Sequence, residues 1–262
     1  MAKEEKTGGM NSFLKWFGGK SKMAKTIVEL MPEHACYCEV FSGAAWVLFR
    51  KEPAKNEIIN DKNQELVNLF RVIKHHKDEF LRQFQYTPIS RFEFDLMKKT
   101  DMRMYTDIQR ASVYYYLIKL TYGGQVKHFN ISMHSAGSSV KKINPDTLEN
   151  TIERACGRLR HVQIENMDYQ ELIPRYDKPG TFFYLDPPYW GYEDAYGKNL
   201  FSREDFIRMR DLLKGIQGKF IMSINNVPEI REIYKDFNIR EVDAKYSIKI
   251  NSDAKELLIM NY

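Results

Sequence analysis

The sequence predicts an α/β protein with a mostly parallel sheet, an antiparallel hairpin near the C-terminus and a small inserted helical subdomain. Three observations lead to this fold. Short apolar runs typical of strands alternate with helical patterns in both outer parts of the chain, which favours parallel strands covered on both faces. A polar turn separates the last two runs, which predicts a hairpin. About ninety residues in the middle break the alternation, which indicates an insertion.

The N-terminal part is expected to begin with a helix over residues 21–30, followed by a short strand over 37–41. A turn then leads into a helix that opens at Trp46. A second strand over 57–61 precedes a helix over 64–76, in which apolar residues recur at helical spacing. These elements form the first half of the predicted sheet and its covering helices.

The C-terminal part contributes five further expected strands. They span residues 161–165, 181–185, 219–224, 239–248 and 255–262. Between the second and third of these, Ser202 and Asp205 give a start like a capping box to a helix over 202–214. The polar turn around 251–253 makes the last two strands a closing hairpin.

The middle of the chain predicts helices over 90–99 and 107–121, and the three tyrosines 114–116 are expected in the core rather than stacked on bases. The following stretch is rich in glycine and in side chains that can donate to phosphates or base edges, namely Gln125, Lys127, His128 and Asn130. A surface loop without such contacts is an equal alternative. The sequence therefore divides into a flexible tail (1–10), a main α/β domain (11–76 and 146–262) and an inserted helical subdomain (77–145).

Composition excludes several classes of protein. The 262 residues are 43% hydrophobic and 29% charged, which is sufficient for a large core and unlike a disordered chain. A formal charge of +5 is compatible with a polyanionic partner. We expect a cytoplasmic protein without a membrane span, because no apolar run is long enough for one. The three cysteines have no metal-ligand spacing, so no metal site is expected.

The segment Asp186-Pro187-Pro188-Tyr189 directly follows the apolar run 182–185 and is the feature that bears most on function. An aspartate with an ordinary pKa near 3.9 is ionised at neutral pH. Its carboxylate and the Pro187 carbonyl could both accept from the N–H bonds of a planar exocyclic amine, which would localise the nitrogen lone pair for attack on a methyl group. Tyr189 offers a face on which an extruded base could stack.

A purely structural interpretation competes with this one, since the same four residues could form an ordinary loop that leaves a strand. Two other segments shift the balance. Gly18 and Gly19, followed by Lys20, form a backbone-donor site typical of anion binding. Asp61, at the end of the second strand, is placed to accept from ribose hydroxyls, at the sheet edge where open α/β folds bind ligands.

The chain resembles the Dam-like family of DNA N6-adenine methyltransferases over nearly its whole length. Four motifs carry the resemblance in that family's order, K-W-F-G-G-K (15–20), V-F-S-G-A-A (40–45), I-N-D (59–61) and D-P-P-Y (186–189). The resemblance implies a Rossmann-like methyltransferase sheet, S-adenosylmethionine as methyl donor without a metal, double-stranded DNA as substrate and base flipping. It also implies that the main domain (11–76 and 146–262) binds the donor and is catalytic, and that the inserted subdomain (77–145) recognises the target.

The resemblance also implies roles for individual residues. The donor is expected to contact Trp16 and Lys20, to be wrapped by Phe41 and Gly43, and to be held at its ribose by Asp61. Asp168 matches the position that reads the donor's adenine. Asp186 should touch both the donor and the target base.

Two departures from the family pattern stand out. Ala45 replaces the second glycine of the turn, a change expected to narrow the turn without abolishing it. Tyr122-Gly123-Gly124-Gln125 stands where the family has its N-G-L-x-R segment, so the target sequence does not carry over.

The sequence thus favours a site-specific adenine methyltransferase, which could act with a cognate restriction nuclease and be a monomer or weak dimer. Methylation of cytosine N4 or of an RNA base is an alternative, because the same polarising geometry suits any amidine-like amine. A DNA-binding relative without turnover is another, and Ala45 is the one hint of it. An NAD-type oxidoreductase is disfavoured because G-x-G-x-x-G is absent after the first strand.

Overall fold

The structure is a computed structural model, and it describes residues 9–14, 16, 18–121, 143–193, 201–243 and 255–262. The described chain divides into two compact units. The first contains residues 1–19, 43–52 and 63–164, and the second contains 20–42, 53–62 and 165–262. Segment 77–145, the predicted insertion, falls wholly within the first unit. The recognition role assigned to it stays a prediction.

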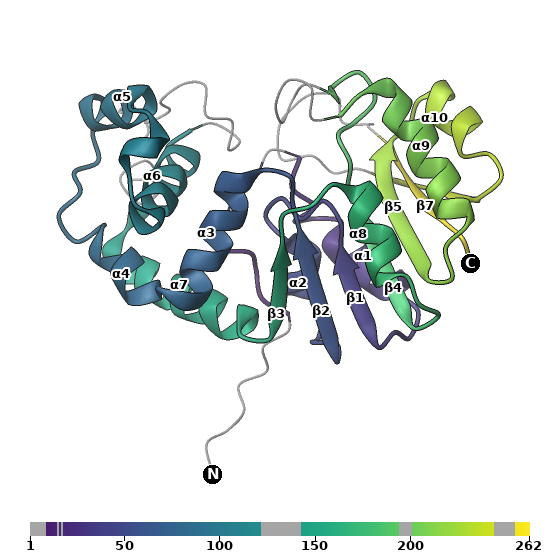
Figure 1. Cartoon of the computed structure of the whole chain (residues 1–262), viewed down its shortest axis with the longest axis horizontal. Helices are drawn as coiled ribbons and strands as arrows, with labels where there is room; N and C mark the ends of the chain where they lie inside the picture. The colour runs from purple at the N-terminus through teal and green to yellow at the C-terminus, as the bar shows by residue number, and fades with distance from the viewer. Residues whose placement is uncertain (1–8, 15, 17, 122–142, 194–200, 244–254) are drawn as a thin grey trace, which may run out of the picture. The chain divides into compact units, whose positions relative to one another are not determined.

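In the described ranges, seven strands form one mixed sheet in the order β3-β2-β1-β4-β5-β7-β6 (Figure 1). They are β1 (Cys36–Glu39), β2 (Asn56–Asn60), β3 (Val162–Glu165), β4 (Thr181–Leu185), β5 (Lys219–Asn225), β6 (Asn238–Asp243) and β7 (Lys255–Met260). The pairs β1–β2, β1–β4 and β4–β5 are parallel. The pairs β5–β7 and β6–β7 are antiparallel. The predicted α/β class, with a mostly parallel sheet and an antiparallel C-terminal pair, is confirmed.

The helices of the second unit are α1 (Ala24–Leu30), α8 (Tyr169–Tyr176), α9 (Arg203–Lys214) and α10 (Pro228–Ile233). Helices α8 and α9 lie over one face of the sheet (Figure 1). Their apolar side chains belong to a continuous core that includes Phe183, Met222 and Leu172. The predicted capping box at the start of α9 is confirmed, because Ser202 and Asp205 bond reciprocally. Helices α8 and α10 have no counterpart among the predicted elements.

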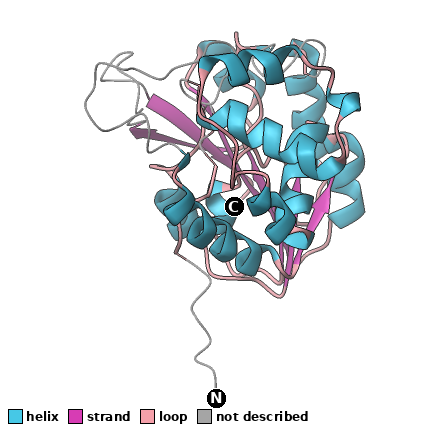
Figure 2. Cartoon of the chain, turned by 90° about the vertical axis from the view of Figure 1, so that its left-hand side faces the viewer, coloured by secondary structure: helices cyan, strands magenta, loops and turns pink. Residues whose placement is uncertain are grey.

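The first unit is largely helical (Figure 2). Its helices are α2 (Trp46–Arg50), α3 (Gln64–His75), α4 (Lys77–Arg82), α5 (Arg91–Lys99), α6 (Asp107–Lys119) and α7 (Pro145–Leu159), with a 3-10 turn, η1 (Met102–Met104). Tyr115 lies at the centre of its aromatic core, with ring centroids 5.5 Å from Phe80 and 5.6 Å from Phe84. Tyr115 and Tyr116 are buried, as predicted for the core, whereas Tyr114 is half-buried and its hydroxyl accepts from Asn63.

Several element boundaries differ from those predicted. The first helix begins at Ala24 rather than Ser21, and the first strand ends at Glu39 rather than Phe41. Strand β6 is described only to Asp243, and the rest of the predicted strand and the turn 251–253 lie outside the described residues. The three cysteines are free thiols, and Cys38 alone of them is fully buried.

Candidate functional site

The predicted site residues fall into both units. Those of the first unit are Trp16, Gly18, Gly19 and Gly43. Those of the second unit are Lys20, Phe41, Asp61, Asp168, Asp186, Pro187, Pro188 and Tyr189. The four predicted DNA contacts, Gln125, Lys127, His128 and Asn130, lie outside the described residues. The groups in each unit are therefore described separately.

In the second unit, Asp186 directly follows β4 and meets two donors from distant parts of the sequence. The Lys20 Nζ lies 2.6 Å from Asp186 Oδ1, and the Ser223 hydroxyl donates to the same oxygen at 3.2 Å. Lys20 is almost fully buried, whereas 19% of the Asp186 side chain is exposed. The carboxylate is thus fixed through one oxygen and is still reachable from solvent.

Lys20 also holds Tyr189, the last residue of the motif. Its Nζ donates to the Tyr189 hydroxyl at 2.8 Å and lies 4.7 Å from the centroid of the ring. A cation over an aromatic face is attracted by the ring quadrupole. One lysine therefore ties the acidic and the aromatic end of the motif together, a role that the predicted contact with a cofactor did not include.

Within the described part of the chain, no hydrogen bond or ion pair falls on Asp186 Oδ2 or on the Pro187 carbonyl. Pro187 and Pro188 are themselves buried, and neither has an N–H that could compete as a donor. The motif therefore presents two acceptor atoms in succession, a carboxylate oxygen and a peptide carbonyl. This arrangement can accept from both hydrogens of a primary amine.

The protonation of Asp186 differs from the sequence expectation. Burial raises the pKa of this carboxyl to about 6, while the charge of Lys20 and the Ser223 hydroxyl oppose the rise. The value of 3.9 expected from the residue type was too low, because it ignored the desolvation of the strand end. At pH 7 the carboxylate is still mostly ionised.

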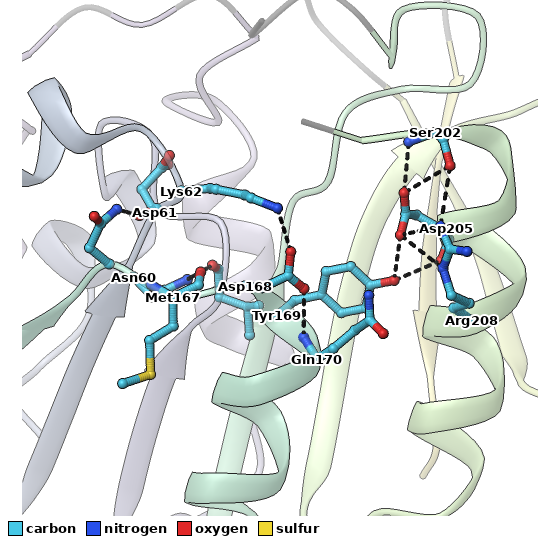
Figure 3. A network of polar contacts seen from close by, with 12 residues as sticks. Asn60, Asp61, Lys62, Met167, Asp168, Tyr169, Gln170, Ser202, Asp205 and Arg208 are labelled. Carbon is cyan, nitrogen blue, oxygen red and sulfur yellow. Dashed lines mark hydrogen bonds and ion pairs between the residues drawn. The ribbon is translucent and has the colours of Figure 1, made fainter. Parts of the chain in front are cut away.

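A second polar group joins the ends of β2 and β3 (Figure 3). Asn60 donates to the carbonyls of Val40 and Met167, and its own oxygen accepts from the Met167 N–H at 2.8 Å. The adjacent Asp61 is tied down through its carbonyl, which accepts from Asn166. The loops after β1, β2 and β3 are thereby cross-linked by a single buried asparagine.

Asp168 belongs to the same group and serves as N-cap of α8. Its Oδ1 accepts from the Gln170 N–H at 3.0 Å, and Lys62 reaches its Oδ2 at 2.6 Å (Figure 3). A carboxylate has about four lone-pair sites, so both oxygens can accept further hydrogen bonds. The structure thus brings Asp61 and Asp168, two predicted cofactor residues, together through their neighbours Asn60 and Lys62.

Phe41 lies in an aromatic cluster next to this group. Its ring centroid is 5.9 Å from that of Tyr169 and 6.1 Å from that of Phe201. The Tyr169 hydroxyl donates to Asp205 at 2.9 Å, which connects α8 to the start of α9 (Figure 3). The cluster forms a rigid apolar wall beside the two acidic residues.

In the first unit, Trp16 packs against the turn that contains Gly43. Gly43 has a φ of +47°, and a Cβ there would lie 2.8 Å from the Trp16 ring. Ala45, two residues later, has a φ of +51° in the left-handed region that favours glycine. The substitution therefore strains the backbone of the turn, which was expected only to narrow.

Sequence reasoning missed Asn60, Lys62, Ser223 and Asn225. Asn60 and Lys62 flank Asp61, so their place beside a predicted ligand residue was a usable signal. Ser223 and Asn225 lie at the C-terminal end of a strand that is apolar at residues 220–222 and 224, and polar residues at this end of a parallel strand mark a ligand-binding edge. Among the described residues, no group of three His, Cys, Asp or Glu side chains could hold a metal ion, and no helix could cross a membrane.

The chain is similar to known DNA methyltransferases over most of its length. The sequence model of the D12 class N6 adenine-specific DNA methyltransferases matches residues 16–248. The chain is 28% identical to the type II methyltransferase M1.LlaDCHI of Lactococcus lactis subsp. cremoris, over 97% of this chain and 96% of that protein. It is 27% identical to the type II methyltransferase M.CviBI of Paramecium bursaria Chlorella virus NC1A, over 97% of this chain and 100% of that protein. It is 24% identical to the DNA adenine methylase of Escherichia coli K12, over 94% of this chain and 91% of that protein.

Proposed function

Because this chain belongs to the D12 class family of N6 adenine-specific DNA methyltransferases, we propose that it transfers a methyl group from S-adenosylmethionine to N6 of an adenine flipped out of duplex DNA. The observation that supports this most is the arrangement at the end of β4. Among the residues that the structure describes, both polar contacts to Asp186 fall on Oδ1, so that Oδ2 and the Pro187 carbonyl can accept from a substrate.

Two acceptors match what the chemistry requires. The lone pair of the adenine amino group is shared with the ring, so the amine is a poor nucleophile. If Oδ2 and the Pro187 carbonyl accept its two N–H bonds, the lone pair is turned out of the ring plane toward the incoming carbon. Fixed acceptors need no reorganisation during the reaction, which is the usual source of such catalysis. Asp186 orients and polarises the amine.

The residues of the second unit fit the predicted methyl donor by their chemistry. Asp61 supplies acceptors for ribose hydroxyls, Asp168 supplies acceptors for an adenine amino group, and Phe41 supplies an apolar wall. S-adenosylmethionine would contribute the methyl group as an electrophile on a sulfonium. Trp16, Gly18, Gly19 and Gly43 are proposed to bind the same donor on the basis of the family motifs.

Tyr189 is proposed to stack on the flipped base. Its side chain is partly exposed, and Lys20 fixes the hydroxyl, so the ring is held in place before a base arrives. A pre-positioned ring costs little entropy on binding. We assign recognition of the target sequence to the inserted segment. A cognate restriction nuclease stays an expectation, in keeping with the name type II methyltransferase that two of the relatives carry.

The direct test is methyl transfer from labelled S-adenosylmethionine into duplex DNA, followed by mass analysis of the digested nucleosides. We expect N6-methyladenine from the wild type. N4-methylcytosine, or product from RNA alone, would contradict the proposed substrate but keep the methyl-transfer chemistry. Absence of any methylated nucleoside over a panel of genomic DNAs, with donor binding intact by calorimetry, would support a binding protein without turnover.

A further inference from the structure

Two polar residues of β5, Ser223 and Asn225, face the motif that follows β4. Residues i and i+2 of a strand point to the same side of the sheet. The β4–β5 register pairs Tyr184 with Ile221 and Leu185 with Met222, so Asp186 comes next to Ser223. The two polar residues therefore lie on the side of the sheet that carries Tyr184 and Asp186.

Ser223 links the carboxylate to a buried tyrosine. It is 0% exposed, and its hydroxyl donates to Asp186 Oδ1 at 3.2 Å. The Tyr184 hydroxyl lies 2.8 Å from the same Ser223 oxygen. Since a serine hydroxyl has one hydrogen, which is used on Asp186, Tyr184 must be the donor in this second bond. Burial and the nearby Asp186 charge raise the pKa of Tyr184, so its hydroxyl keeps that proton.

Asn225 holds the other end of the motif. The Trp190 N–H donates to Asn225 Oδ1 at 3.0 Å, and Asn225 Nδ2 donates back to the Trp190 carbonyl at 3.1 Å. The Asn225 side-chain amide thus bonds both the N–H and the carbonyl of Trp190, as the backbone of a neighbouring strand would do. The loop leaving β4 is therefore fixed at its first residue, Asp186, and at its fifth, Trp190, by two neighbours on one strand.

We propose that Ser223, supported by Tyr184, and Asn225 are positioning residues that set the orientation of the Asp186 carboxylate and of the Pro187 carbonyl toward the substrate amine. This inference rests on the proposed function. Ser223 and Lys20 approach Asp186 Oδ1 from different elements, so the carboxylate cannot rotate without breaking one of the two contacts. That restraint leaves Oδ2 as the oxygen presented to the amine.

Other charged groups near Asp186 define how a pH measurement should be interpreted. Lys20 stabilises the ionised carboxylate, and the buried Glu256 on the adjacent β7 opposes ionisation. Tyr184 contributes a neutral hydroxyl. Removal of the Ser223 hydroxyl takes away a hydrogen bond to the charged form and leaves both charges in place. The pKa of Asp186 should then rise.

The test compares Ser223→Ala, Tyr184→Phe and the double variant in single-turnover methyl transfer at saturating donor and DNA. Ser223→Ala is expected to slow transfer by about 10- to 100-fold, since a small misplacement of a reacting group has effects of this size. KM for DNA should change less than about twofold. Tyr184→Phe should cause a smaller loss. The double variant should be no slower than Ser223→Ala, because the tyrosine acts through the serine.

Matched controls separate positioning from general damage to the core. Thr181→Val removes a buried hydroxyl at the opposite end of β4, where it donates to the Tyr176 carbonyl at 2.7 Å. Tyr234→Phe removes a buried phenol that donates to the Phe206 carbonyl at 2.9 Å. Both should lower thermal stability and leave the transfer rate within about twofold. Additive losses in the double variant, or equal losses in the controls, would overturn the proposal.

A readout independent of activity distinguishes failure of this inference from failure of the proposed function. Carbon-detected NMR titration of the Asp186 carboxyl should give a higher pKa in Ser223→Ala than in the wild type and no change in Asn225→Ala. Asn225→Ala should still slow methyl transfer. An Asp186 pKa that is the same in wild type and Ser223→Ala would overturn the role of Ser223 even if adenine methylation is confirmed. A shifted pKa without methylation would reject the function alone.

Discussion

The two faces of the sheet in the second unit are made by alternate residues of the same strands and differ in character. One face carries Phe183 and Leu185 of β4 with Phe220, Met222 and Ile224 of β5, all fully buried against α8 and α9. The other face carries Tyr184 and Asp186 beside Ser223 and Asn225, which bond to one another and to the loop. The first face is apolar, whereas the second also carries the buried Phe182 and Ile221 and becomes polar toward the C-terminal ends of the two strands.

A short strand such as β4 can contribute both to the apolar core and to the polar site. Side chains alternate with a period of two, so Leu185 and Asp186 are neighbours in sequence and lie in different environments. Burial favours the apolar face, whereas it raises the pKa of Asp186 and so opposes its charge. As pH rises from the ordinary pKa of an aspartate to about 6, the free energy of unfolding therefore falls, because the unfolded chain ionises first. Substitutions on the two faces should therefore have separable effects.

The largest expected effect is on the polar face. Asp186→Ala removes an acceptor of the amine and should slow methyl transfer by at least about 10³-fold. The melting temperature should change by only a few degrees, because the side chain is partly exposed and its burial is unfavourable. Radiolabel incorporation and calorimetric melting measure the two quantities. Incorporation equal to that of the wild type would remove Asp186 from the reaction.

On the apolar face, Phe183→Ala should show the converse. Truncation of a fully buried phenylalanine costs about 3–5 kcal/mol of unfolding free energy through lost burial and a cavity. The transfer rate per folded molecule should stay within about threefold of the wild type. Urea unfolding and active-site titration would check this. A rate loss as large as that of Asp186→Ala would show that the faces are not separable.

The pH dependence sharpens the comparison further. Transfer requires the ionised carboxylate, so the single-turnover rate should fall as pH decreases through about 6, the pKa to which burial raises Asp186. In Lys20→Met the stabilising charge is lost, so the same fall should occur at higher pH. At saturating donor the rate loss of this variant should be several-fold larger at pH 7 than near pH 8.5, where only the loss of the Lys20 restraint on Asp186 and Tyr189 remains. Superimposable profiles would contradict the role of Lys20.

A smaller effect is expected for Lys62, which pairs with Asp168 at 2.6 Å from a partly exposed position. Such pairs contribute up to about 1 kcal/mol. Lys62→Met should weaken donor binding by up to about fivefold, because Asp168 loses one of its two restraints. Lys235→Met, which breaks an exposed pair with Glu232, is the matched control and should leave binding unchanged. Equal dissociation constants for both variants would exclude Lys62.

The smallest effect is expected outside the sheet, at the strained turn of the first unit. Ala45→Gly removes a buried methyl group but relieves a left-handed conformation that costs about 1–2 kcal/mol for alanine. Ala44→Gly removes an equally buried methyl group without that relief. Ala45→Gly should therefore be more stable than Ala44→Gly by about 1 kcal/mol. Equal stabilities would show that the turn is relaxed.

The sequence predicted the strand-like runs and the D-P-P-Y segment well, because continuous apolar runs and proline geometry are local properties of the chain. It placed β4 at Thr181–Leu185, where the structure has it. It could not predict that Lys20 pairs with Asp186, or that β5 holds the motif, because these contacts join residues 35 to 166 positions apart. The pKa predicted for Asp186 was too low for the same reason, since desolvation of the carboxylate depends on packing around the strand end.

The central claim is that Asp186 accepts from the target amine, and one binding cycle tests it most directly. The DNA that the wild type methylates is compared with a duplex in which purine, which lacks the amine, replaces the target adenine, for wild type and Asp186→Ala. Effects of the analogue on base flipping cancel between the proteins. A hydrogen bond to a charged group predicts at least about tenfold less preference for adenine in the variant. An unchanged preference would contradict the account.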